Sequence, residues 1–402
     1  MTPVKWMVPA WVLVCAAAFA APALPPPAKG SSIALIGSGL GDRLQYDGYF
    51  ETLLHLRYPD RSLVVRNLCF PGDTAAYRPR AARDNPWAFP GAEKFCPSLA
   101  KHRGDGIEPS PDEWLALCKP DTILAFFGYN ESFAGPAGIA AFSGELDAWI
   151  THTLSQKYNG ASSPAIVLVS PIAFEDLSAS LDLPDGVREN ENLALYTETM
   201  RKVAADRKVG FIDLFIPTKA LMEKEPKPIT SNGFLLNDDG NRLLAPILTD
   251  ALYGPAPLVS KASPAKLREL VIDKADSFRS DYRILNGVHV YGRRRAPFGT
   301  VNYPQEIAKI RELTANRDRA VWSCASGRMF DLTSADASTR KLDPVETNFK
   351  RPITYQNEDD SVASFKMMPG FKIELFASEA RFPDLRNPVQ MSFDNRGRLW
   401  VS

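Results

Sequence analysis

Residues 32–54 read SIALIGSGLGDRLQYDGYFETLL, and they predict a strand, a glycine turn and a helix in succession. Ser32–Ile36 is apolar, too short for a helix and bounded by small residues, which is typical of a buried strand. Gly37–Gly39 forms a tight turn, and apolar side chains then recur at helical spacing (Phe50, Leu53 and Leu54). Open α/β sheets place their chemistry at the carboxyl ends of strands, so this turn is the first candidate site. The alternative, an ordinary strand-to-helix turn without chemistry, fits the same pattern.

Apolar strands continue to alternate with helical segments as far as Tyr253. The five expected strands are Ser32–Ile36, Ser62–Leu68, Thr122–Phe127, Ala165–Val169 and Gly210–Leu214. Short apolar strands separated by helices are typical of a parallel sheet that is covered on both faces. Right-handed crossovers then restrict the topology to the doubly wound class. The sequence therefore predicts an α/β fold, a three-layer αβα sandwich with a five-stranded parallel sheet, over residues 31–255.

Small or polar residues follow four of these strands directly. They are Gly37–Gly39, Gly72, Gly128–Asn130 and Ser170. Because the carboxyl ends of parallel strands share one edge of the sheet, we expect these turns to lie near one another. Asn232–Leu235 precedes the closing helix and is able to reach the same edge.

Composition excludes some function classes. The net charge of the 402 residues is zero, so nothing favours nucleic-acid binding. The four histidines are scattered, no cysteine spacing resembles a zinc site, and no C-x-x-C-H haem motif occurs, so we expect no metal and no cofactor. The four cysteines that follow the N-terminal segment allow three pairings, of which we favour Cys96–Cys118.

The N-terminal segment predicts export. Lys5 supplies a positive charge, Trp6–Ala20 is apolar, and Ala18–Ala20 forms a small-x-small cleavage site. We therefore interpret residues 1–21 as a signal peptide and residues 22–30 as a stiff proline-rich linker, and expect a secreted or periplasmic protein. An uncleaved membrane anchor is the alternative.

The order of the turn segments resembles the four sequence blocks of the SGNH/GDSL hydrolases. The matching segments are Gly37–Gly39, Gly72 in NLCFPGD, Asn130 in FFGYNES, and NGFLLNDDGNRLL from Asn232. The resemblance covers about residues 31–255 and lies in block order and spacing. It implies a flavodoxin-like sandwich in which Gly72 and Asn130 occupy the positions of the family's oxyanion donors.

The catalytic positions of that family are occupied here by residues that lack its chemistry. The resemblance aligns Gly39 with the nucleophilic serine, Asn232 with the orienting aspartate and Leu235 with the histidine base. Glycine has no nucleophile, leucine accepts no proton, and asparagine does not stabilise an imidazolium. Ser38 is the only hydroxyl of this turn and is the rival nucleophile.

The alternation of apolar strands and helices ends at Tyr253. We assign residues 256–364 to a helical connector, in which Pro304 is expected at the first position of a helix. The connector also contains a basic run, Arg293–Arg295, which we interpret as solvated surface; binding of an anion is the alternative.

Residues 365–402 predict strands. Phe371–Ala377 alternates like a strand, and Asp394–Gly397 is a hairpin signal between two apolar runs. This segment resembles the first blade of a β-propeller in large secreted planctomycete-type proteins called membrane-bound dehydrogenases or haem-binding proteins. That resemblance implies a downstream propeller and cytochrome modules in a longer protein.

Three functions remain open. The first is a non-catalytic SGNH-fold module that binds a glycan or acyl ligand as an accessory domain of a larger dehydrogenase-like protein. The second is an active esterase that acts on acylated glycans through Ser38, and the third is a purely structural domain.

Overall fold

The computed structural model describes residues 23–80, 82–99, 106–344, 356–385 and 388–402. The chain forms two compact units, residues 1–345 and 346–402. The expected signal peptide, residues 1–21, lies outside the described residues. Within the described ranges no helix has the length and apolar character needed to cross a membrane.

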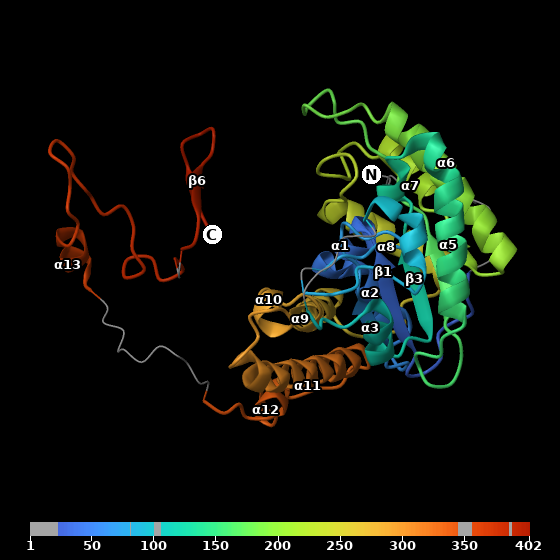
Figure 1. Ribbon diagram of the computed structural model, residues 1–402. Coiled ribbons are helices and arrows are strands. Elements are labelled where there is room, and N and C mark those ends of the chain that lie inside the picture. Colours follow the sequence, from blue (N-terminus) through green and yellow to red (C-terminus); the bar gives the residue numbers. More distant parts are fainter. Residues whose placement is uncertain (1–22, 81, 100–105, 345–355, 386–387) are drawn as a thin grey trace, which may run out of the picture. The chain divides into compact units, whose positions relative to one another are not determined.

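The first unit is built on a five-stranded parallel sheet between helices, as predicted (Figure 1). The strand order is β2-β1-β3-β4-β5, and every neighbouring pair is parallel. The strands are β1 (Ser32–Gly37), β2 (Val64–Asn67), β3 (Thr122–Phe126), β4 (Ala165–Val169) and β5 (Gly210–Ile212). Because β1 and β3 are neighbouring parallel strands at the point where the strand order reverses, the turns that follow them lie side by side.

Alternate residues of β1 enter two different cores. Ala34 and Ile36 pack under α3 (Pro111–Cys118), α5 (Ile139–Leu154) and α6 (Val187–Arg207). Ile33 and Leu35 pack on the other face, under α1 (Gly39–Asp47), α2 (Tyr49–Arg57) and α8 (Asp238–Tyr253). Short elements complete this domain: α4 (Tyr129–Ser132), α7 (Phe215–Lys224), and the 3₁₀ turns η1 (Ala92–Phe95), η2 (Pro97–Leu99) and η3 (Gly135–Gly138).

The single helix expected after β1 is two helices, which corrects the sequence-based interpretation. Gly48 separates α1 from α2 and has a φ of +68°, a conformation that ends a helix and that glycine adopts at little cost. A Cβ at Gly48 would lie 3.1 Å from the Ile272 side chain, so the break also lets α9 (Pro264–Tyr282) approach closely.

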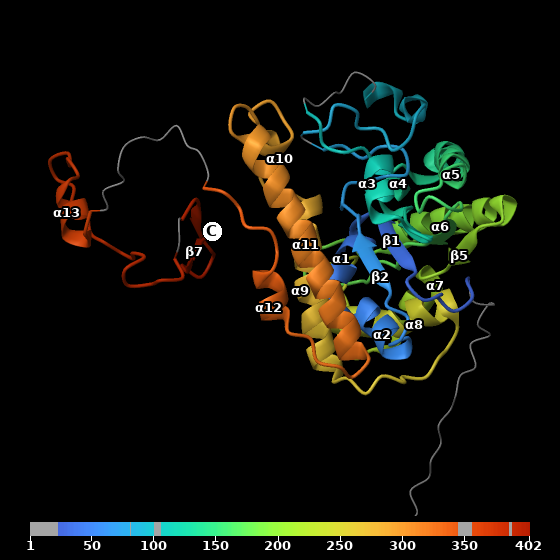
Figure 2. The same cartoon turned by 90° about the horizontal axis from the view of Figure 1, so that it is seen from below.

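The connector helices cover the edge strand β2. Lys274 and Tyr282 of α9 donate hydrogen bonds to the carbonyls of Val65 (3.0 Å) and Leu68 (2.8 Å). Trp322 of α11 (Gly299–Ala325) donates to the carbonyl of Leu63 at 2.7 Å. These bonds occupy groups that an open sheet edge would expose, so α9 and α11 complete the sheet (Figure 2).

The remaining connector helices are α11 and two short helices, and the start of α11 differs from the prediction. Pro304 is not the first residue of its helix: α11 begins at Gly299, and Pro304 lies within it. A proline so near the start removes a single ladder bond, which the helix tolerates. Two short helices flank α11, α10 (Gly287–Val290) before it and α12 (Leu332–Ala337) after it.

The second unit contains a short helix and one hairpin. The elements are α13 (Glu358–Ala363), β6 (Met391–Phe393) and β7 (Leu399–Val401). The predicted hairpin is confirmed, since β6 and β7 pair antiparallel around Asp394, whose carboxylate accepts from the Arg396 and Arg398 amides at 2.9 Å. The strand expected over Phe371–Ala377 does not form; the segment has no pairing partner among the described residues.

The expected Cys96–Cys118 disulfide is absent, because both thiols are free. Their surroundings differ. Burial raises the pKa of the Cys118 thiol to about 12 despite the nearby positive charge of Arg66, whereas Cys96 lies half-buried near Glu145.

Candidate functional site

A cavity of about 430 Å³ lies at the carboxyl ends of β1, β3 and β4. We call it the apolar pocket, because most of its wall is aromatic or aliphatic. Its wall is formed by Ser38–Leu40, Asp42, Arg43, Pro71, Phe126, Phe127, Tyr129, Asn130, Phe133, Val169–Ile172, Phe234 and Leu235. The turns that follow three separate strands therefore meet around one cavity.

The glycines of the first turn are not equivalent. Gly37 has a φ of +115°, and a Cβ there would lie 2.2 Å from the Phe126 carbonyl oxygen, so only glycine fits. At Gly41 a Cβ would lie 2.5 Å from the Cys69 sulfur. At Gly39 the nearest heavy atom would be Leu235 Cδ2 at 3.9 Å, an ordinary contact. Neither backbone conformation nor space requires glycine at position 39.

Gly39 and Leu235 thus face each other across the pocket. They are the residues that the family resemblance aligns with the nucleophile and the base. A side chain at position 39 would point at the side chain of residue 235, as a nucleophile and its base must. Neither residue 39 nor residue 235 carries a nucleophile or a base in this chain.

Ser38 also lines the pocket, and its backbone is held by two hydrogen bonds. Its side chain is 2% exposed, its amide donates to the Phe126 carbonyl (2.8 Å), and its carbonyl accepts from the Asp42 amide (3.2 Å). Histidine is not among the described residues that form the pocket wall. The buried His55 is instead 3.4 Å from the Glu51 carboxylate.

Asn130 and Gly72 were the two candidate oxyanion donors. Asn130 lines the pocket, but its side-chain NH₂ donates to the carbonyls of Pro71 and Asp73, both at 2.9 Å. Both of its N–H bonds therefore hold the loop after β2 in place. Gly72 is exposed and is not part of the described wall, whereas its neighbour Pro71 is.

Asn232 shapes a turn and does not form part of the described pocket wall. Its Oδ1 accepts from the Leu235 amide at 3.0 Å, which closes a side-chain-to-backbone turn. Gly233, with a φ of +92°, lies against the Phe174 ring. This turn places Leu235 in the wall.

An aromatic wall is the part of the site that the sequence analysis missed. Tyr129 stacks on Phe234 with 4.8 Å between ring centroids and meets Phe133 edge-on at 5.5 Å. Phe133 is 72% exposed at the rim. The signal was available, since Tyr129 and Phe133 lie in FFGYNESF and Phe234 in NGF, but their meeting depends on the fold.

Two acidic side chains lie beneath this region. Glu131 accepts from the Gly128 amide (2.8 Å) and the Ala75 amide (3.3 Å), and Glu145 accepts from Thr74 Oγ1 at 3.1 Å. Burial, together with the charge of Glu145, raises the pKa of Glu131 to about 7. Burial also raises the pKa of Glu145. These carboxylates support the turns and do not enter the pocket wall.

The arrangement offers no metal-binding cluster: within the described ranges no group of three or more His, Cys, Asp or Glu side chains is placed to hold an ion. The expected absence of a cofactor stays a prediction.

Solved structures similar to this chain include a gut microbial diltiazem-metabolizing enzyme, with 16% identity and a TM-score of 0.41 over 58% of this chain and 49% of that one. The match thus spans about half the length of that enzyme. The acetyl xylan esterase AlAXEase has 17% identity and a TM-score of 0.36 over 55% of this chain and 99% of its own. An acetylxylan esterase from Geobacillus stearothermophilus has 14% identity and a TM-score of 0.39 over 56% and 96%.

A family described as a domain of unknown function (DUF7133) matches residues 357–402, which lie in the second unit. No curated protein matches the chain.

Proposed function

We propose that residues 31–255 form a non-catalytic SGNH-type module that binds an apolar group, such as an acyl chain or the apolar face of a glycan, in the apolar pocket. The observation that carries the proposal is the pair Gly39 and Leu235, which face each other without a nucleophile or a base. The wall around them is apolar and has a stacked ring pair suited to a flat or aliphatic group.

The alternatives have less support. An esterase that uses Ser38 needs a general base within hydrogen-bond reach, and none of the described histidines lines the pocket. A purely structural domain has no need of a solvent-open pocket of about 430 Å³ with a stacked aromatic wall.

The wider context is part of the proposal. The N-terminal segment supports export to the periplasm or the exterior, and the β6–β7 hairpin supports a β-propeller that begins near residue 365. We place the module in a longer dehydrogenase-like protein with a propeller and cytochrome modules as its partners.

Calorimetric titration of the full chain with octyl glucoside, phenyl glucoside and glucose tests ligand binding. We expect both glucosides with an apolar group to bind and glucose not to bind. Gly39→Leu fills the pocket next to Leu235 and should weaken binding at least about tenfold. Ala140→Leu, on the exposed side of α5, controls for added surface apolarity and should bind as the wild type. Equal binding of glucose, or unchanged binding by Gly39→Leu, would contradict the proposal.

A further inference from the structure

A second cavity lies between the loop after β2 and the start of the α10 region. Its volume is about 730 Å³. We call it the basic cleft. Its wall is formed by Phe70, Pro79, Arg80, Ala82, Glu108, Tyr282–His289, Tyr291, Arg293 and Arg294. It differs from the apolar pocket in its wall residues and in its chemistry.

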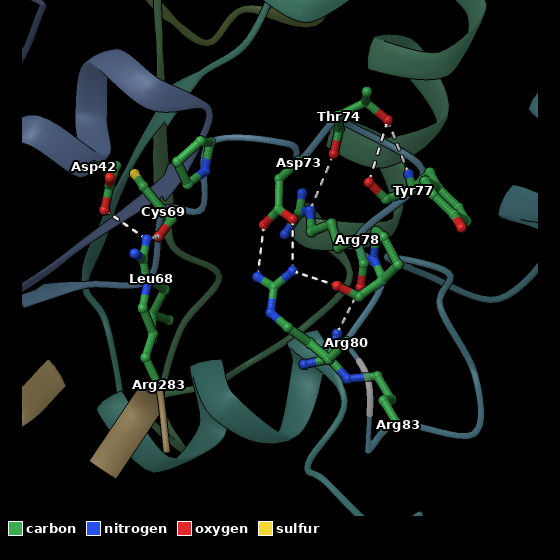
Figure 3. A network of polar contacts seen from close by, with 12 residues as sticks. Asp42, Leu68, Cys69, Asp73, Thr74, Tyr77, Arg78, Arg80, Arg83 and Arg283 are labelled. Atoms are coloured by element: carbon green, nitrogen blue, oxygen red, sulfur yellow. Dashed lines mark hydrogen bonds and ion pairs between the residues drawn. The ribbon is translucent and has the colours of Figure 1, made fainter. Parts of the chain in front are cut away.

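Two arginines of this wall are held rigidly (Figure 3). Arg80 donates to both oxygens of Asp73 (2.7 and 2.9 Å) and to the Tyr282 hydroxyl (2.9 Å). Arg283 donates to Asp42 Oδ1 and to the Cys69 carbonyl, both at 2.5 Å. Such anchoring fixes each guanidinium in advance, so little entropy is lost when a ligand binds.

Both guanidinium groups also lie against one aromatic ring. The Phe70 centroid is 4.2 Å from Cζ of Arg80 and 4.5 Å from Cζ of Arg283. Two like charges are thereby brought to the same ring, and their repulsion falls when an anion lies between or beside them.

Behind the wall lie further cationic side chains. Arg78 and Arg83 are buried, with 5% and 3% of their surface exposed. Arg78 donates only to backbone carbonyls, those of Thr74 and Ala75. With Arg80 and Arg283 they make four arginines, which face the carboxylates of Asp42, Asp73 and Glu108, the last of these 3.5 Å from Arg83.

The hydrogen-bonding capacity of these arginines is also incompletely used. The buried Nε atoms of Arg80, Arg83 and Arg283 have no hydrogen-bond partner among the described residues. Buried cations are normally paired and fully hydrogen-bonded, because an unpaired buried charge is costly. Each of the three arginines is paired with a carboxylate, but one N–H donor of each is left unused within the described part of the chain.

The basic run of the connector completes the cleft. Arg293 and Arg294 are exposed and line it. Their loop is joined to the domain, since the Ile107 amide donates to the Tyr291 carbonyl at 2.9 Å. A Cβ at Gly106 would lie 2.1 Å from the Ala82 carbonyl oxygen, so three segments meet tightly here.

We propose that the basic cleft binds an oxyanion, a phosphate, sulfate or carboxylate group carried on a sugar-sized molecule, through Arg283 and Arg294, with Arg80 adding positive charge to the wall. The guanidinium fork matches all three oxyanions, and Phe70 and the tyrosine rings provide a flat wall for the rest of the ligand. The cleft is larger than one anion needs, which leaves room for that body. This inference goes beyond the proposed function and does not depend on it.

Calorimetry on the full chain at about 50 mM NaCl, where screening is weak, tests the inference. The probes are glucose 6-phosphate, glucose 6-sulfate and glucuronate, with glucose as the uncharged control. We expect at least one charged sugar to bind, glucose not to bind, and the order among the three to identify the oxyanion. Binding by none of the charged sugars, or equal binding of glucose, would overturn the proposal.

Matched arginine variants locate the binding site. Arg294→Gln should weaken binding about tenfold, the loss of one charge-assisted hydrogen bond, and Arg293→Gln/Arg294→Gln should weaken it further. Arg295→Gln removes the same charge from the adjacent position, which is not part of the described wall, and should change binding less than about twofold. Equal effects of Arg294→Gln and Arg295→Gln would show general attraction to positive surface and would contradict the proposed site.

Discussion

The apolar pocket and the basic cleft lie on two sides of one loop and have opposite chemistry. Pro71 lines the pocket, and the adjacent Phe70 lines the cleft. The pocket lies where the family resemblance places catalysis, and its facing residues are Gly39 and Leu235. The cleft combines residues of that domain with Tyr282–Arg294, which lie outside the resemblance, and is lined by fixed guanidinium groups. The wall of the cleft is therefore richer in arginine than the wall of the pocket.

The two cavities are also physically connected through shared residues. The Asp73 carboxylate pairs with Arg80 on the cleft side. The backbone carbonyl of Asp73 accepts a hydrogen bond from the Asn130 side chain on the pocket side. Asp42 lines the pocket and binds Arg283 of the cleft. A substitution of either aspartate should therefore alter the side-chain arrangement in both cavities.

Removing the negative charge of Asp73 should have the largest effect. Asp73 is 1% exposed, so Asp73→Asn leaves the buried Arg80 without its counter-charge. We expect the free energy of unfolding to fall by about 3–5 kcal/mol in urea denaturation. Glu269→Gln, which removes one partner of the exposed Lys266 pair, should cost less than about 1 kcal/mol. Similar small losses for both variants would show that the loop is not held by this ion pair.

The first turn provides the next contrast, because two of its glycines differ in the room around them. Gly37→Ala forces a Cβ against the Phe126 carbonyl at a positive φ and should destabilise the protein by at least about 2 kcal/mol. Gly39→Ala meets only Leu235 at 3.9 Å and should change stability by less than about 0.5 kcal/mol. Thermal unfolding of the two variants is the measurement. A strongly destabilised Gly39→Ala would mean that glycine is structurally required there.

The smallest effect concerns the acids beneath the pocket. The pKa of Glu131 is raised from 4.5 to about 7, so the folded state binds its proton more tightly than the unfolded state does. Stability should therefore fall as pH rises from 4.5 to 7. As the pH rises from about 5 to about 8, the free energy of unfolding of Glu131→Gln should increase by on the order of 1–2 kcal/mol relative to that of the wild type. The measurement is the free energy of unfolding as a function of pH. The Glu198→Gln variant, changed at an exposed position, should give a curve parallel to that of the wild type. A parallel curve for Glu131→Gln would contradict the raised pKa of Glu131.

Most of the sheet could be predicted from the sequence because its strands are continuous apolar runs. Each expected strand from Ser32–Ile36 to Gly210–Leu214 lies within about two residues of the observed one. The helix break at Gly48 was missed, since one glycine inside an amphipathic pattern does not reveal a positive φ. The strand predicted over Phe371–Ala377 was wrong, because alternation of apolar and polar residues alone does not supply a pairing partner.

More of the apolar pocket than of the basic cleft could be predicted from the sequence. The turn residues of the apolar pocket follow strands, so their meeting at one edge followed from topology. The wall of the basic cleft combines Phe70–Arg80 with Tyr282–Arg294, segments far apart in the chain. Arg293–Arg295 was visible as a basic run, but its docking against the loop after β2 depends on the tertiary contact with Ile107.

Hydrolysis of 4-nitrophenyl acetate and acetylated xylo-oligosaccharides by the full chain and its Ser38→Ala variant tests the central claim, that the pocket binds without catalysing. Groups that bind the reacting oxygen can leave weak residual turnover when a triad is missing, so a low rate that Ser38→Ala leaves unchanged is the predicted result. Turnover of about 1 per second or faster that Ser38→Ala abolishes would contradict the account and assign the pocket to an esterase.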